Sequence, residues 1–573
     1  MGAFFIASKE IAAAKLQQLD AAHRARGFAL ARMVPLDHHT VFQYRKLDGE
    51  GGVGVETAGG GFACVTGQLI YRSSIGEEAL RRYCADLARG TVDDDAVLGQ
   101  FALLLRERGR LRLITDAMGF FQVYADTGAG VASSSFWAML ELLPKISIDE
   151  TGVYQYAWNG ATFGGRTFVR EIRRLPADAE LACGDRMTIR RRHAAPPTPS
   201  VPARSSSQVV ETHAQRLRTL FAGLAEGFGA LLRVSFSSGY DSRLMLAGLM
   251  AAGLRPRLFV YGRAGAIDVE IARQVATGEG LSLDVIDKSR LVDADTAASP
   301  ARQERDFDRF DAWKVDGIFD DGADAVDRLS RHDGGGVPLN GSLGEIYRNF
   351  FYIPNRPTTL KAVTDSFFSA YAPAACTRRF SPAAYTSALV RCFQEELCCD
   401  DNRVSRDGVE RLYPLVRGRY WTGRDVNLNL RFGRMVFPFM HRQLIAGTAE
   451  IPIPWKNHGR LEAKLIERLA PTLAGYPSGY GYRFCDPPPL RYRARNWLTL
   501  YRPPWLRRRS YRLRFAWRHR FPAYLAADHL AHFMDGEMPY MRRFFHLEHL
   551  HDADAFNRVA TMEYIFQRYS AQD

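Results

Sequence analysis

A hexapeptide between a largely apolar run and a helical pattern combines residue types that bind phosphate. Ser237-Ser238-Gly239-Tyr240-Asp241-Ser242 follows residues 231–236 and precedes the apolar pattern that begins at Leu244. A loop that enters a helix presents backbone N–H groups and the positive end of the helix dipole to an anion. Serine hydroxyls add donors, Gly239 permits close approach, and Asp241 offers a carboxylate for a magnesium ion bound to phosphate. The hexapeptide therefore predicts an anion site.

Two comparisons limit this interpretation. The hexapeptide matches neither the G-x-x-x-x-G-K-[ST] phosphate loop nor the G-x-G-x-x-G dinucleotide pattern. An ordinary capped turn between a strand and a helix stays open as the alternative, because Asp and Ser begin helices in any protein.

The elements around the hexapeptide must hold it at one edge of a sheet. Strand and helix signals alternate through residues 209–365, which predicts a parallel sheet covered by helices on both faces. Residues 1–192 instead show short alternating strands with glycine-rich turns, and the Pro- and Ser-rich residues 193–208 are predicted to be a linker. From about residue 366 the pattern is mostly helical. We therefore expect domains at 1–192 and 209–485 and a helical extension at 486–573.

Composition excludes several classes of protein. The chain has 573 residues, 46% of them hydrophobic, so it can bury more than one core. Its eight cysteines form no C-x-x-C pair, which argues against a zinc ribbon or a disulfide framework and favours the reducing cytoplasm. No stretch approaches 18 consecutive apolar residues, so the expectation is a soluble protein.

Part of the net charge of +13 is concentrated in residues 491–520, which contain eleven arginines, no acid, and interleaved Trp, Tyr and Phe. This composition could contact an anionic membrane surface or the phosphates of nucleic acid. The ordinary alternative is a solvated segment whose arginines pair with acids elsewhere in the fold. Of the two ligands, the membrane or a large anionic acceptor is favoured over nucleic acid.

Several ordered segments resemble the asparagine synthetase B family, whose relatives include β-lactam synthetases and lasso-peptide cyclases. "FSSGYDSRLMLAGL" resembles the family's S-G-G-x-D-S pyrophosphate loop, and "VPLNGSLGEIYRNFF" resembles its S-G-E-G-x-D-E signature. Residues 258–287 and 437–471 are similar to its second strand and helix and to its P-F-L-D segment with a Lys-x-x-x-Arg helix. Residues 98–124 and 131–140 resemble its glutaminase domain.

The resemblance implies an Ntn-hydrolase-like αββα sandwich followed by a Rossmann-like, parallel-sheet PP-loop ATP-pyrophosphatase domain. It further implies ATP and Mg²⁺ as cofactors, with Asp241 and Glu345 as the metal ligands. The residues implied to hold pyrophosphate or line adenosine are Ser237, Ser238, Gly239, Tyr240, Ser242, Val260, Tyr261, Gly262, Asn340 and Gly341.

Three departures from the family pattern bear on activity. Gly2 stands where members that hydrolyse glutamine have their cysteine nucleophile, and Thr66-Gly67-Gln68 replaces the N-G-E loop. The glutaminase half is therefore expected to be structural. The family's late lysine is also missing from residues 476–484, so Arg483, or Lys464 and Arg468 on one helix face, is expected to replace it.

The expected activity is an ATP-dependent ligase that adenylates a carboxylate, releases pyrophosphate and transfers the acyl group to ammonia or an amine. A degenerate nucleotide-binding or scaffold protein, a tRNA-modifying enzyme, and a peptide cyclase or polysaccharide-modifying amidotransferase stay open as alternatives. The expected location is the cytoplasm, with the inner face of the membrane as a variant, and the chain is a candidate homodimer. The sequence does not identify the carboxylate.

Overall fold

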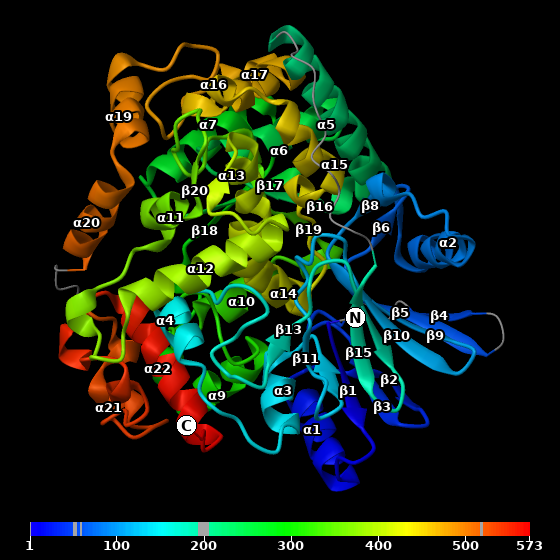
Figure 1. Ribbon diagram of the computed structural model, residues 1–573. Helices are drawn as coiled ribbons and strands as arrows, with labels where there is room; N and C mark the ends of the chain where they lie inside the picture. Colours follow the sequence, from blue (N-terminus) through cyan, green and yellow to red (C-terminus); the bar gives the residue numbers. More distant parts are fainter. Residues whose placement is uncertain (1, 50–53, 58–59, 193–205, 516–519, 573) are drawn as a thin grey trace.

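The computed structural model describes residues 2–572 except 50–53, 58–59, 193–205 and 516–519 (Figure 1). Most of the predicted linker, 193–208, thus lies outside the described residues, and its last three residues already belong to helix α5 (Ser206–Phe228). The predicted mixed α/β class is confirmed: two six-stranded antiparallel sheets precede a four-stranded parallel sheet along the chain.

The antiparallel sheets form the N-terminal half. The first has the order β13-β11-β12-β1-β3-β2, with strands at Arg173–Arg174, Tyr124–Asp126, Val131–Ser133, Ala3–Ser8, His39–Tyr44 and Leu30–Pro35. The second has the order β15-β14-β10-β9-β5-β4, with strands at Met187–Arg191, Ala179–Cys183, Arg110–Thr115, Phe101–Glu107, Gly61–Gly67 and Gly54–Thr57.

The alternation of side chains along these strands fixes what each face covers. In β9, Ala102 and Leu104 join the main core, whereas Leu103 and Leu105 face helix α2 (Gly76–Arg89) in a separate cluster. Such division follows from the two-residue period of a strand. Helices α1 (Ala13–Ala25) and α3 (Phe136–Leu142) pack with the first sheet, where the buried ring of His23 stacks on Tyr44 at 4.4 Å.

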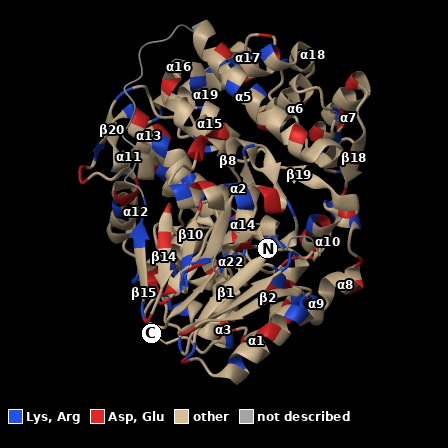
Figure 2. Cartoon of the chain, turned by 90° about the vertical axis from the view of Figure 1, so that its right-hand side faces the viewer, with Lys and Arg blue, Asp and Glu red and all other residues tan. Residues whose placement is uncertain are grey.

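The parallel sheet carries the hexapeptide. Its order is β18-β17-β16-β19, with strands at Leu283–Ile286, Arg257–Tyr261, Leu232–Ser235 and Val337–Leu339. The chain leaves β16 toward β17 and β18 and later returns to β19 on the other side of β16, so the strand order reverses between β16 and β19. Helices α5, α6 (Tyr240–Ala251) and α17 (Arg460–Leu469) pack together beside this sheet (Figure 2).

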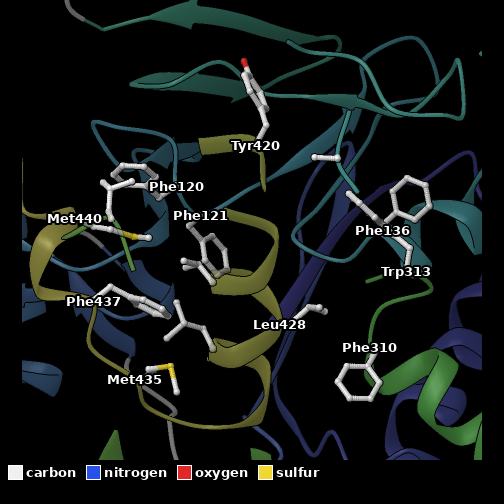
Figure 3. Close-up of a cluster of buried hydrophobic side chains, with 14 of the residues drawn as sticks. Phe120, Phe121, Phe136, Phe310, Trp313, Tyr420, Leu428, Met435, Phe437 and Met440 are labelled. Carbon is white, nitrogen blue, oxygen red and sulfur yellow. The ribbon is translucent and has the colours of Figure 1, made fainter. Parts of the chain in front are cut away.

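One continuous core joins the two halves. In the cluster of Figure 3, Phe136 of the N-terminal half lies 6.0 Å from Trp313, ring centre to ring centre. Asp311 accepts hydrogen bonds from the N–H groups of Phe136 and Trp137 at the start of α3, and the buried Arg424 pairs with the same carboxylate at 2.9 Å. The halves are therefore joined by hydrogen bonds to a buried carboxylate as well as by apolar contact.

The predicted extension, 486–573, is not one unit. Helices α19 (Leu490–Tyr501) and α20 (Pro504–Arg514) lie at the left edge of Figure 1, on the outside of the molecule. Helix α22 (Ala553–Arg568) is largely buried against α4 (Glu150–Asn159) of the N-terminal half. Arg558 donates to the carbonyl of Ala157 at 2.9 Å, and Thr561 accepts from the N–H of Ile318 at 2.8 Å. The last helix is thus part of the main core.

Among the described residues, we find no helix with the length and apolar character needed to cross a membrane.

Candidate functional site

The loops that follow β16 and β19 meet at the carboxyl ends of these two strands. In an open parallel sheet, ligands bind where the strand order reverses. Gly341 and Gly344, after β19, both lie against Asp241. A Cβ on Gly341 would stand 3.2 Å from Asp241 Cβ, and a Cβ on Gly344 would stand 2.1 Å from Asp241 Oδ1. Leu343 between them has a φ of 75°, a left-handed conformation, at the position of the second glycine in the resembled signature. The two loops are thus built for close approach at Asp241.

Arg348 lies at the centre of three carboxylates. Its Nη2 donates to Asp241 Oδ2 at 2.6 Å and lies 3.7 Å from Glu345 Oε1, and its Nε lies 3.1 Å from Glu462 Oε2. The structure thus brings Asp241 and Glu345 together as predicted, but around a guanidinium. Tyr413 donates to the other oxygen of Glu345 at 2.6 Å.

Burial changes the protonation of this cluster. Burial raises the pKa of Asp241 although Arg348 opposes the shift, and burial raises the pKa of Glu462 well above its usual range. Burial alone would lower the pKa of Arg348, but the carboxylates around it raise it well above its usual value. The carboxyl groups of Asp241 and Glu462 also form a hydrogen bond with each other, which protonated Glu462 donates and which favours the ionised form of Asp241. Three carboxyl groups thus surround one guanidinium, and two of them share a proton.

The serine loop is bonded differently from the prediction. We expected its N–H groups to point outward, but those of Ser237, Ser238 and Gly239 donate to Ser242 Oγ, Asp268 Oδ1 and Ser237 Oγ. The hydroxyl of Ser238 also donates to Asp268. Side chains of serine and aspartate thus occupy the donors that a phosphate would need.

The segment at residues 476–484, where the family's lysine is missing, covers this loop. The N–H of Gly479 donates to the carbonyl of Ser238 at 3.3 Å, and the ring of Tyr480 lies 4.6 Å from that of Tyr240. Arg243, buried on α6, holds the segment by donating to the carbonyls of Tyr476 and Pro477 at 2.9 and 2.6 Å. Arg483 is exposed.

The residues expected to line adenosine end the neighbouring strand. The side chain of Val260 is buried, so only its backbone could face a ligand, and Tyr261 donates to Asp327 at 3.0 Å. Gly262 has a φ of 147°, and a Cβ there would stand 2.9 Å from Val269. Asn340 accepts from the N–H of Ser342 at 2.8 Å and so caps the β19 loop.

Lys464 and Arg468 are not brought to the site, which corrects the expectation that they replace the missing lysine. Both are about half exposed, and they pair with Glu467 and Glu211 at 2.7 Å. Glu462 is the residue of α17 that faces Arg348. Positions two and six residues further along a helix point about 200° and 240° away from it, which turns Lys464 and Arg468 outward.

The sequence interpretation missed Arg348, Glu462 and Asp268. A signal existed for Glu462, which sits between Leu461 and Ala463 on the buried face of α17, where an unpaired acid is costly. The described residues contain no group of three or more His, Cys, Asp or Glu placed to hold a metal ion. Asp241 and Glu345 supply two carboxylates, which are oxygen ligands of the type that magnesium prefers.

Comparison with known proteins adds little to this geometry. No protein-family model and no curated protein matches the chain. One similar solved structure is an allosteric regulatory enzyme of purine biosynthesis, with 11% identity, 49% of this chain and 79% of that chain covered, and a TM-score of 0.24. Another is the glutamine phosphoribosylpyrophosphate amidotransferase from B. subtilis, with 10% identity, 50% and 91% covered, and a TM-score of 0.23. Scores this low support no conclusion about fold or activity.

Proposed function

We propose that this protein is an ATP-dependent carbon–nitrogen ligase of the asparagine synthetase type. It adenylates a carboxylate, releases pyrophosphate and transfers the acyl group to ammonia or an amine. The observation that carries the proposal is the convergence of Asp241 and Glu345 where the strand order reverses, beside a serine-rich loop that enters α6. The N-terminal half, in this proposal, keeps a glutaminase-like fold without the activity.

The residues present fit the phosphates of ATP with bound magnesium. Asp241 and Glu345 are carboxylates that lie 2.6 and 3.7 Å from the same guanidinium nitrogen of Arg348. Magnesium, when bound, would neutralise phosphate charge. Asp241 and Glu345 would hold it, and Arg348 would supply the positive charge expected of the missing lysine.

Binding requires an exchange inside the serine loop. Pyrophosphate oxygens would replace Asp268 as the acceptor for the N–H and hydroxyl of Ser238, because two anions cannot share these donors. The hydroxyls of Ser237 and Ser242 bond to each other at 3.1 Å and would be donors after the same exchange. Asp268 therefore competes with a bound anion for these donors, which lowers the affinity of the loop for that anion.

The same contacts favour one alternative, a catalytically degenerate nucleotide-binding or scaffold protein. Arg348 contacts both proposed metal ligands, and Asp268 accepts the hydrogen bonds that the loop would donate to phosphate. The folded chain therefore pairs part of the charge and the donors of its site without a ligand. A peptide cyclase or polysaccharide-modifying amidotransferase of the same fold would use the same site. The homodimer and the cytoplasmic location stay predictions.

The test is ATP–pyrophosphate exchange with a panel of carboxylates. Asp241→Asn and Glu345→Gln should each reduce exchange by roughly 10²-fold or more, since one such electrostatic contact contributes roughly 3 kcal/mol. The matched control is Asp284→Asn, which should keep full exchange. Asp284 lies on β18, has a partly exposed carboxylate and pairs with Arg257 of β17. Undiminished exchange in both site variants would refute the ligase. ATP-dependent thermal stabilisation without exchange would establish the degenerate alternative.

A further inference from the structure

Helix α19 presents a stripe of apolar side chains to solvent. Leu490, Trp497, Leu498 and Tyr501 are 78, 57, 63 and 56% exposed. At about 100° per residue these positions fall within one sector of roughly 100°, and the exposed Ala494 lies in the same sector. Trp505, at the start of α20, is also 57% exposed. Large apolar residues gathered on one face indicate a contact surface and not chance exposure.

The opposite face of α19 is fixed to the protein. The ring of Tyr492 lies 5.9 Å from Tyr480 and 5.5 Å from Tyr482, in the segment that covers the serine loop. Arg507 of α20 is buried and donates to the carbonyls of Phe351 and Tyr352 at 2.8 and 2.5 Å. These contacts hold the helix in place with its apolar stripe outward.

Arginines flank the stripe on both sides. Arg493 lies on one side, and Arg491, Arg495 and Arg502 lie in a row on the other. Arg491, Arg495 and Arg502 line an open pocket of about 430 Å³, to which Ala494 and Leu498 contribute apolar surface. The sequence has no acidic residue between Asp486 and Asp528. In the described part of the chain, no carboxylate lies within ion-pair distance of Arg491, Arg493 or Arg495.

We propose that this face docks on the surface of an anionic phospholipid bilayer. An apolar stripe of Leu and Trp flanked by arginines is the pattern of a helix that lies in the plane of the membrane interface. Trp and Tyr settle at the level of the headgroups, and arginines attract anionic lipid. A nucleic-acid surface would use the arginines but would leave Leu490 and Leu498 exposed.

Vesicle flotation with the full chain tests the proposal. Binding should occur to vesicles of phosphatidylglycerol and phosphatidylcholine and not to phosphatidylcholine alone. The triple variant Arg491→Gln, Arg493→Gln, Arg495→Gln should bind about a hundredfold more weakly, since each basic residue near an anionic surface contributes roughly a fivefold factor. The matched control replaces Arg81, Arg82 and Arg89 of α2, all exposed, with glutamine and should bind as wild type does.

A second variant separates lipid from other anions. Trp497→Ser with Leu498→Ser keeps every arginine but removes apolar contact, so vesicle binding should fall while any binding to RNA is unchanged. Met33→Ser with Ile189→Ser is its control, because both residues are exposed elsewhere. Gel filtration and thermal unfolding identify variants that fail to fold. Wild-type protein that ignores anionic vesicles, or a serine variant that binds them normally, overturns the proposal.

Discussion

Two aspartates, one in each half of the molecule, have opposite surroundings. Asp116 of the N-terminal half accepts hydrogen bonds from the N–H groups of Met118, Phe120 and Phe121 at 3.1, 3.1 and 2.9 Å. Asp241, beside the parallel sheet, accepts a hydrogen bond from Arg348 and another from the carboxyl group of Glu462. Burial raises the pKa of both carboxyl groups, that of Asp116 to about 6.

The contrast separates structural from functional use of buried charge. No carboxyl oxygen of the described N-terminal half is buried without a hydrogen bond, whereas the carboxyl groups of Asp241, Glu345 and Glu462 converge on the guanidinium of Arg348 in the other half. A buried charge without full hydrogen bonding lowers stability unless a ligand completes it. A cluster of acids around one cation therefore indicates the half that binds, and a carboxylate held by backbone N–H groups indicates the half that supports.

The largest expected effect compares two arginines that pair with fully buried carboxyl groups, Arg348 with Glu462 and Arg424 with Asp311. Arg348→Gln removes the cation of the site, and Arg424→Gln removes the partner of Asp311 between the halves. Each should lower the free energy of unfolding by about 3–5 kcal/mol, because a buried carboxylate loses its partner. Magnesium should restore thermal stability to Arg348→Gln more than to Arg424→Gln, because it can replace the lost positive charge beside Asp241 and Glu345. Equal responses of the two variants to magnesium would remove the distinction between the halves.

A smaller effect is expected where the N-terminal half resembles a glutaminase. A Cβ on Gly2 would lie 2.8 Å from the carbonyl oxygen of Arg45 and 2.9 Å from Cα of Lys46. Gly2→Cys should therefore lower the free energy of unfolding by about 1–3 kcal/mol and leave glutamine hydrolysis absent. Glutamate release from glutamine, with and without ATP, is the measurement. ATP-stimulated glutamate release from the wild type or the variant would mean that the N-terminal half hydrolyses glutamine.

The smallest effect concerns the pH dependence of Glu462. Its raised pKa means that the folded state binds a proton more tightly than the unfolded state, so stability is lost as pH rises above about 4.5. Glu462→Gln keeps the neutral side chain and should remove this loss. The difference in melting temperature between variant and wild type should grow from about pH 4.5 upward. A difference independent of pH would mean that Glu462 is ionised in both states.

The sequence predicted the features that depend on neighbouring residues. Alternating strand and helix signals predicted the parallel sheet, and the serine hexapeptide predicted the turn into α6, because both patterns are local. The bond between Arg348 and Asp241 joins residues 107 positions apart, and nothing in the sequence around either one indicates it. The role of Asp268 and the outward direction of Lys464 likewise depend on packing. The sequence shows that Gly2 lacks a nucleophile, but only the structure shows that Arg45 leaves no room for one.

The buried position of α22 has a consequence for the order in which the chain can complete its fold during synthesis. Arg558 and Asn557 bond to Ala157 and Phe319, residues that leave the ribosome 401 and 238 positions earlier. Translation adds about 5–20 residues per second, so the apolar surface that α22 covers stays exposed to solvent for roughly ten seconds or more after its synthesis. During that interval the nascent chain exposes surface that chaperones bind. Ribosomes stalled before residue 553 should therefore carry protease-sensitive chains even though the two antiparallel sheets and the parallel sheet are already synthesised.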